Sequence, residues 1–201
     1  PFWQIVIEDD MRERNVSYEQ SFETMRGMYQ AMKEADAAYD PKLRSASGMV
    51  GGDGEKLEEF HKKKNRLIGD FLTEVMEKAV KMGESNACMK RIVAAPTAGS
   101  CGVIPAVLLT YEMQKNVSED KLVEALFVAA GIGEVIAASA SIAGAEGGCQ
   151  AEIGPDTFLF TQGTSTSPAT GSQVRPSMFF RANAAACTIS CSLPPSRYAT
   201  A

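Results

Sequence analysis

The chain has 201 residues, of which 45% are hydrophobic and 22% are charged, and its formal net charge at pH 7 is -5. This composition is ordinary for a globular protein, and the length suffices for one domain with a sizeable core. No run of Lys and Arg is dense enough to follow a phosphate backbone, which argues against nucleic acid as a partner. The one basic cluster, "HKKKNR" at residues 61–66, follows the acidic "EKLEEF" and is interpreted as a solvated helix face.

The cysteines and the apolar stretches favour a cytoplasmic protein without a membrane segment. The five cysteines are an odd set that lacks the paired spacing of a disulfide framework. Residues 92–111 carry no charge, but proline and glycine interrupt them repeatedly, so a membrane helix is not expected. The opening "PFWQIVIEDD" lacks the regions of a signal peptide, and its start without Met suggests a processed or incomplete product.

The first half of the chain predicts three helices. The first covers Ser17 to Ala38 and ends at Asp40-Pro41, because the residue before proline avoids helical geometry. Its apolar residues recur at helical spacing as a methionine-rich stripe that we interpret as core packing, namely Phe22, Met25, Met28, Tyr29 and Met32. A second begins at about Glu55. The third covers residues 67–82, and its predicted apolar side consists of Leu67, Phe71, Leu72, Val75, Met76 and Ala79.

Two more helices follow, and together the elements predict an all-α fold. One begins near Pro105, a favourable residue for a first turn. The other follows Ser118, a candidate N-cap, and its small residues from Ala129 onward allow tight helix packing. Runs of alternating β-branched residues, which strands would need, are missing.

Three loops of small residues separate these helices, at residues 45–54, 95–102 and 139–154, and we expect them to converge on one site. The composition then changes. Residues 155–201 contain no Glu or Lys, are rich in Ser and Thr, and are broken by five prolines. We therefore expect a helical domain over 1–154 and an irregular tail over 155–201, either disordered or read in the wrong frame.

Several common sites are excluded by their spacing. A dinucleotide fingerprint at Gly131 and Gly133 fails because its third glycine position is Ile136 and no strand precedes it. "GGDGEK" lacks the order of a phosphate loop. The only histidine, His61, lies in a charged helix, so nucleophilic catalysis by Ser or Cys has no base nearby. No CxxC pair suggests structural zinc.

The stretch "ASIAGAEGGCQAEIG" places Cys149 after two glycines and between Glu146 and Glu152. Such a thiol can be a ligand of a metal centre, with the glycine loops supplying N–H groups to a small anionic substrate. A cysteine between glycines is also common as a tightly packed residue, and the residues alone leave both interpretations open.

Three motifs nevertheless carry a family resemblance: "SASGMVGGDGEKL", "RIVAAPTAGSCGVIPAVLL" and "EALFVAAGIGEVIAASASIAGAEGGCQAEIG". From about Tyr18 to Gly154 the chain resembles the alpha chain of the iron-sulfur-dependent L-serine dehydratases, which convert L-serine to pyruvate and ammonia. The resemblance implies a helical domain, a beta-chain partner, and a [4Fe-4S] cluster held by three cysteines, one of which matches Cys149. An open iron would act as a Lewis acid on the serine hydroxyl.

The resemblance also implies site residues and a departure from the family. The substrate carboxylate and amine are expected at Ser45, Ser47, Gly51, Gly52, Thr97 and Ser100. Cys101 is expected to be a loop or packing residue and not a ligand. The family's other two cysteine ligands follow the matched region, and the spacing of Cys187 and Cys191 does not match them. An inactive remnant and a cysteine desulfidase relative therefore remain alternatives. We also expect association, because missing helices would uncover residues 122–145.

Overall fold

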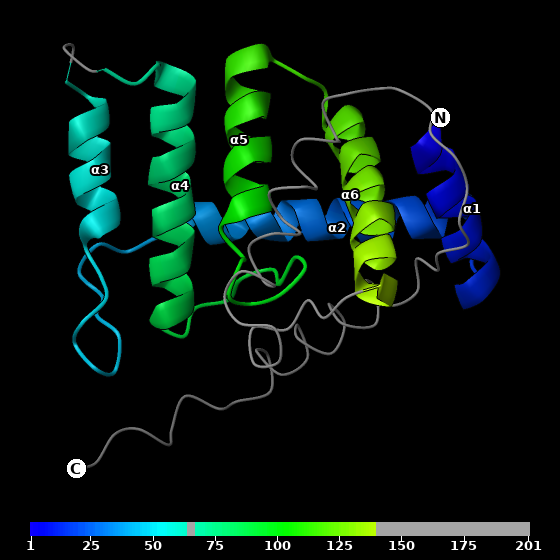
Figure 1. Ribbon diagram of the computed structural model, residues 1–201, viewed down its shortest axis with the longest axis horizontal. Helices are drawn as coiled ribbons and strands as arrows, with labels where there is room; N and C mark the ends of the chain where they lie inside the picture. Colours follow the sequence, from blue (N-terminus) through cyan, green and yellow to red (C-terminus); the bar gives the residue numbers. More distant parts are fainter. Residues whose placement is uncertain (64–66, 140–201) are drawn as a thin grey trace.

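The computed structural model describes residues 1–63 and 67–139, which form six α-helices and no strand (Figure 1). The predicted all-α class is confirmed for this part of the chain. The predicted 139–154 loop and the 155–201 tail lie outside it, apart from Ser139. The helices are α1 (Phe2–Arg14), α2 (Tyr18–Ala37), α3 (Asp53–His61), α4 (Asp70–Ala87), α5 (Val103–Lys115) and α6 (Glu119–Ser139).

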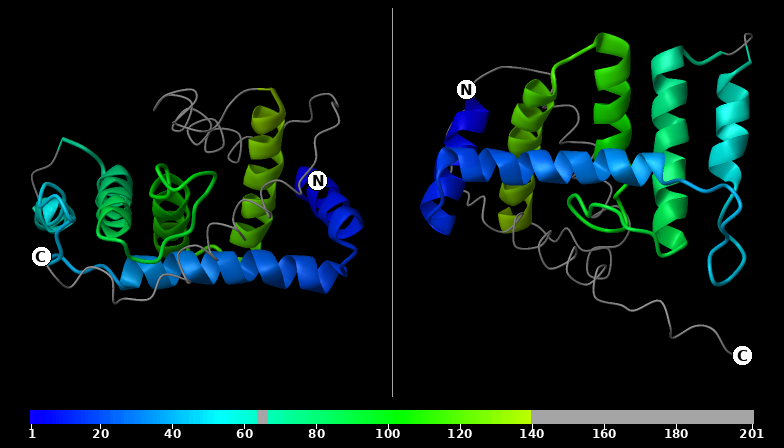
Figure 2. Two further views of the ribbon diagram at one scale, coloured as in Figure 1. Left: turned by 90° about the horizontal axis from the view of Figure 1, so that it is seen from below. Right: turned by 180° about the vertical axis from the view of Figure 1, so that it is seen from behind.

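The long helix α2 crosses a row formed by the later helices. Helices α3, α4 and α5 stand side by side with alternating directions, and α6 is tilted against them (Figure 1, Figure 2). Helix α1 packs on α6 and on the start of α2. The α2–α3 loop, the α4–α5 loop and the C-terminal end of α6 consequently all lie on one side of α2, along the lower edge of the row in Figure 1.

Helix α2 supplies the centre of the core. Ser17 caps it by a reciprocal pair of hydrogen bonds with Gln20, which explains its start. The methionines predicted to form its apolar stripe include Met25 and Met32, which are fully buried beside Tyr29. They pack with Phe127 of α6 and its neighbours in one cluster. The stripe is therefore core packing, as the sequence predicts.

Helix α1 was not predicted. Its buried Asp10 accepts hydrogen bonds from Arg14 Nε at 2.6 Å and from Ser21 Oγ of α2 at 2.5 Å. On its other side, a Cβ atom on Gly131 would lie 2.5 Å from Cγ2 of Val6. The small residues of α6 thus allow the close packing that the sequence predicts, here against α1.

The predicted apolar side of the third helix is wrong. Helix α4 begins at Asp70, so Leu67 precedes it and is fully exposed, while Leu72 is 52% and Met76 41% exposed. The fully buried positions of α4 instead include Thr73 and Glu77. The cause is that charged side chains of α4 are paired with α3, Lys81 with Glu58 and Glu77 with His61, and so occupy positions that an apolar stripe would otherwise fill.

Among the helices that the structure describes, none combines the length and the hydropathy that a membrane span requires.

Candidate functional site

Two loops that the sequence singles out are attached to the last turns of α4. The α2–α3 loop contains Ser45 to Gly52, and the α4–α5 loop contains Thr97 to Ser100. Glu84 of α4 contacts the residues directly after the first loop, and Asn86 Nδ2 donates to the carbonyl oxygen of Ala98 at 2.8 Å. One helix end therefore positions both loops.

The first loop is a tight turn closed by Ser45. The Ser45 N–H donates to the Val50 carbonyl oxygen at 2.9 Å, and the Val50 N–H donates to Ser45 Oγ at 3.1 Å. The hydroxyls of Ser45 and Ser47 lie 3.1 Å apart, with Ser47 exposed and Ser45 partly exposed. The turn therefore presents two adjacent hydroxyl groups, whose substrate contacts stay a prediction.

Gly51 and Gly52 continue the loop with a backbone that favours glycine. Their φ angles are +136° and +81°. A Cβ atom on Gly51 would also collide with the carbonyl oxygen of Leu43. Within residues 1–63 and 67–139, the N–H groups of both glycines make no hydrogen bond. The loop that carries the paired hydroxyls thus also has two adjacent backbone donors without a partner in these residues, of which Gly51 is partly exposed and Gly52 is buried.

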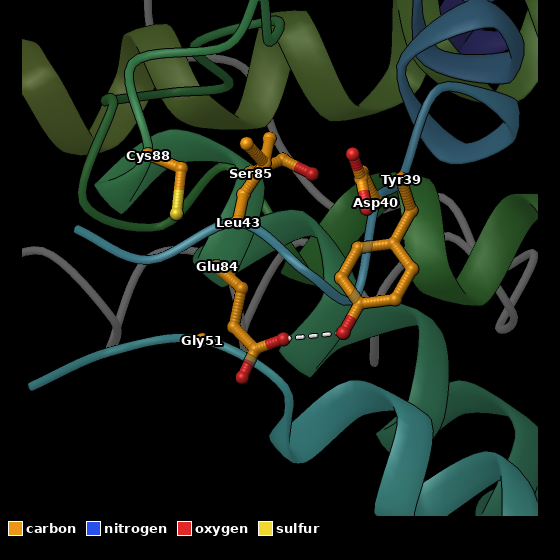
Figure 3. A pocket seen from close by; sticks show the side chains of 7 residues that line it. All are labelled: Tyr39, Asp40, Leu43, Gly51, Glu84, Ser85 and Cys88. Atoms are coloured by element: carbon orange, nitrogen blue, oxygen red, sulfur yellow. Dashed lines mark hydrogen bonds between the residues drawn. The ribbon is translucent and has the colours of Figure 1, made fainter. Parts of the chain in front are cut away.

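Glu84 anchors the end of this loop from another helix (Figure 3). Its side chain is almost fully buried, and it accepts hydrogen bonds from the Asp53 N–H at 2.6 Å, the Gly54 N–H at 3.2 Å and the Tyr39 hydroxyl at 2.6 Å. The N-cap of α3 is Gly52, which has no side chain to cap the helix. The Glu84 carboxylate therefore serves as the cap, in a position that the helix dipole favours.

Tyr39 is a donor to this carboxylate. Burial and the hydrogen bond to Glu84 raise the pKa of Tyr39 well above its usual value, so the phenol keeps its proton. Sequence reasoning missed both Tyr39 and Glu84. The available signal was the start of α3, "GGDGEK", which offers no capping side chain at the glycine before Asp53 and so requires an acceptor from elsewhere.

A small pocket lies between the α2–α3 loop and α4 (Figure 3). Two acidic groups, Asp40 and Glu84, belong to its wall. Of the six predicted substrate residues only Gly51 lines it. The complete lining consists of Tyr39, Asp40, Leu43, Gly51, Glu84, Ser85 and Cys88.

The second loop carries a second pair of hydroxyl groups. Thr97 Oγ1 and Ser100 Oγ lie 3.0 Å apart, and Ser100 is buried. Close packing against α4 fixes the end of the loop, because a Cβ atom on Gly102 would lie 2.6 Å from the carbonyl oxygen of Ala79. The structure thus brings the four predicted hydroxyl residues together in two pairs, one on each loop.

The described residues do not fit an iron-sulfur cluster. No group of three or more His, Cys, Asp and Glu side chains could hold a metal ion in the part of the chain that the structure describes. Cys101 is 1% exposed and packs with Ala35 and Met82, as the sequence predicts for a packing residue. Cys88 is partly exposed beside the pocket. The predicted ligand Cys149 lies outside the described residues.

His61 is not near these loops. It is the last residue of α3, at the opposite end of that helix from the glycine loop, and its Nδ1 lies 2.9 Å from Glu77 Oε2.

Comparison with known proteins identifies the family. Residues 1–156 match the family model described as serine dehydratase alpha chain. The chain is 35% identical over 150 residues to a probable L-serine dehydratase, alpha chain, of Bacillus subtilis, covering 75% of this chain and 50% of the relative. It is 32% identical over 163 residues to the L-serine dehydratase, alpha chain, of Peptoniphilus asaccharolyticus, covering 76% and 52%.

A shorter match reaches L-serine dehydratase 2 of Escherichia coli, at 47% identity over 77 residues, which are 38% of this chain and 17% of that protein. No solved structure matches the chain. The chain spans about half the length of the alpha chains that it matches. Since the family model covers most of the chain, the protein belongs to the serine dehydratase alpha chain family.

Proposed function

We propose that this chain forms the substrate-binding part of an L-serine dehydratase, which converts L-serine to pyruvate and ammonia together with a beta chain. Family membership and the names of the relatives support the reaction. The observation that carries the proposal is the pair of hydroxyl-bearing loops attached to one end of α4.

Each group on these loops suits one part of L-serine. The adjacent N–H groups of Gly51 and Gly52 would donate to the carboxylate, as backbone donors do in other anion sites. The hydroxyl oxygens of Ser45 and Ser47 can accept from the ammonium group. Thr97 and Ser100 would contact the substrate from the second loop. Binding between two loops fixes the orientation of the Cα–H bond that must break.

The cofactor of the proposal is the [4Fe-4S] cluster that the family resemblance implies. When bound, it would supply a Lewis acid for the departure of the serine hydroxyl. Cys149 is its proposed ligand in this chain, since the described residues hold no group of three or more side chains that could bind a metal ion. The beta chain, an oligomeric state and a cytoplasmic location likewise stay predictions.

The test is anaerobic reconstitution of the chain with its beta partner, iron and sulfide, followed by a pyruvate assay with L-serine. We expect wild-type enzyme to form pyruvate and to show cluster absorbance, and Cys149→Ala to lose both. Cys88→Ala is the matched control, because it also removes one free thiol and Cys88 belongs to no group of three or more possible metal ligands among the described residues.

Two outcomes would contradict the proposal. Absence of both cluster and pyruvate from the wild-type preparation would indicate an inactive remnant of the family. Faster release of sulfide from L-cysteine than of ammonia from L-serine would indicate a cysteine desulfidase relative.

A further inference from the structure

We infer that Glu84 is a positioning residue of the proposed serine site, which sets the Gly51–Gly52 donors relative to the Thr97–Ser100 loop. The inference rests on the proposed function and adds to it a residue that lies in neither predicted loop. It starts from the three hydrogen bonds that converge on a single, nearly buried carboxylate.

Glu84 restrains the glycines through the residues that follow them. The Asp53 and Gly54 N–H groups donate hydrogen bonds to its carboxylate, and these two residues come directly after Gly51 and Gly52 in the chain. Glycine has no Cβ and can adopt many combinations of φ and ψ. The orientation of the Gly51 and Gly52 N–H groups is therefore fixed by neighbouring contacts and not by the glycines themselves. The hydrogen bonds between Ser45 and Val50 restrain the chain before the glycines, and the peptide N–H groups that bind Glu84 restrain it after them.

The second loop is attached within the same turn of α4. Asn86, two residues after Glu84, donates to the carbonyl oxygen of Ala98. A short helical segment that contacts both loops therefore helps to determine the separation between them. A catalytic site is sensitive to this separation, because a misplacement of about 1 Å can cost roughly a hundredfold in rate.

The contacts of Glu84 also separate positioning from catalysis. Both carboxylate oxygens already accept hydrogen bonds, from two backbone N–H groups and a phenol. We therefore assign Glu84 no proton transfer.

Glu84→Gln is the most informative substitution, because it retains length and shape. A glutamine has one acceptor oxygen, and its NH₂ group would face at least one N–H or O–H donor. The loss of a charge-assisted hydrogen bond and the new donor–donor contact should release the start of α3. Tyr39→Phe is a milder second variant, which removes one donor and leaves both backbone contacts.

The matched control is Glu74→Gln. Glu74 lies on the same helix, and its side chain accepts a hydrogen bond from exposed Gln114 of α5 at 2.8 Å. Among the described residues no hydrogen bond joins Glu74 to either loop, so this variant reports the effect of removing one negative charge from α4.

The experiment measures steady-state kinetics with L-serine in the reconstituted two-chain enzyme, and hydrogen exchange of residues 43–56. For Glu84→Gln we expect KM to rise roughly tenfold, the equivalent of one lost charged hydrogen bond, with a smaller change in kcat. Exchange should accelerate in 43–56 and stay unchanged in α5. Tyr39→Phe should show a smaller rise in KM, and Glu74→Gln none.

Each other outcome decides the question. If Glu84→Gln left KM unchanged and exchange of residues 43–56 became faster, Glu84 would be only a structural helix cap and the inference would be wrong. Unchanged KM together with unchanged exchange would overturn the inference as well. A lower kcat at constant KM would also overturn it, because it would place Glu84 in the chemical step. A wild-type enzyme that neither binds nor converts L-serine would instead overturn the proposed function itself.

Discussion

Gly51 combines two requirements that only glycine meets at once. Its φ of +136° lies where side chains cause strain, and an added Cβ atom would collide with the Leu43 carbonyl oxygen. Gly48 meets the first requirement alone, since its φ is +71° and nothing lies within 4 Å of an added Cβ. The two glycines of one loop therefore allow backbone strain to be separated from steric collision.

We expect Gly51→Ala to destabilise the protein more than Gly48→Ala does. Gly48→Ala should cost about 1–2 kcal/mol of unfolding free energy, from the left-handed backbone alone. Gly51→Ala should cost more, because the Leu43 backbone must move as well. Urea unfolding followed by circular dichroism measures both values. Equal losses would show that the loop relaxes around the new methyl group.

Helix α3 is attached to α4 mainly by charged groups. Gly54 is its one fully buried residue. Lys81 of α4 donates to Glu58 at 2.8 Å and to Glu77 at 2.6 Å, and Glu77 also meets His61. Burial disfavours the charged form of Lys81, but these carboxylates outweigh it and raise the pKa of Lys81 above its usual value. The element that follows the glycine loop thus depends on ionised side chains for its packing.

Acid should therefore weaken the attachment of α3. Hydrogen bonds from Lys62 and Lys81 lower the pKa of Glu58 from 4.5 to about 2 in the folded protein. A lowered pKa adds stability above pH 4.5, and this contribution is lost as the pH falls from 4.5 toward 2. The Glu58→Gln variant should lose less stability than the wild type as the pH falls from 4.5 toward 2. We expect this difference to be less than about 1 kcal/mol, because the ion pair is partly exposed.

Thermal unfolding at pH 7 and at pH 3 checks this difference. Glu59→Gln is the control, because Glu59 is an exposed neighbour on the same helix. The same loss of stability in wild type and Glu58→Gln would show that the ion pair contributes nothing to the attachment.

At the scale of the molecule, exposed apolar residues lie on α4 and α5. Leu72, Met76, Tyr111 and Met113 are each at least 41% exposed. The expected reason for association was a loss of cover over residues 122–145. In the structure Leu122, Val123, Leu126 and Phe127 are fully buried in the core. The expected loss of cover is therefore contradicted for these four residues, whereas Val135 of the same run is 36% exposed. The exposed apolar side chains of α4 and α5 provide a further surface for association.

We expect the isolated chain to form oligomers or aggregates in size-exclusion chromatography with light scattering. Met76→Lys should reduce association by adding a charge to the exposed side of α4. Met49→Lys is the control, because Met49 is 86% exposed on the α2–α3 loop, away from this helix face. A monomeric wild-type peak with a cooperative thermal transition would contradict the prediction.

The sequence by itself determined the features that depend on local pattern. Helical spacing of apolar residues predicted α2 and its buried methionines, and clusters of glycine predicted the two described loops, because both signals come from residues close together in the chain. The motifs also identified the family correctly.

Tertiary structure alone decided the buried face of α4, the existence of α1 and the role of Glu84. In each case the partner group comes from a distant segment: Lys81 bridges to α3, Asp10 of α1 binds Ser21, and Glu84 caps a helix that begins 31 residues before it. A charged side chain becomes favourable in a buried position only when such a partner satisfies it, and which partners meet is settled when the helices pack.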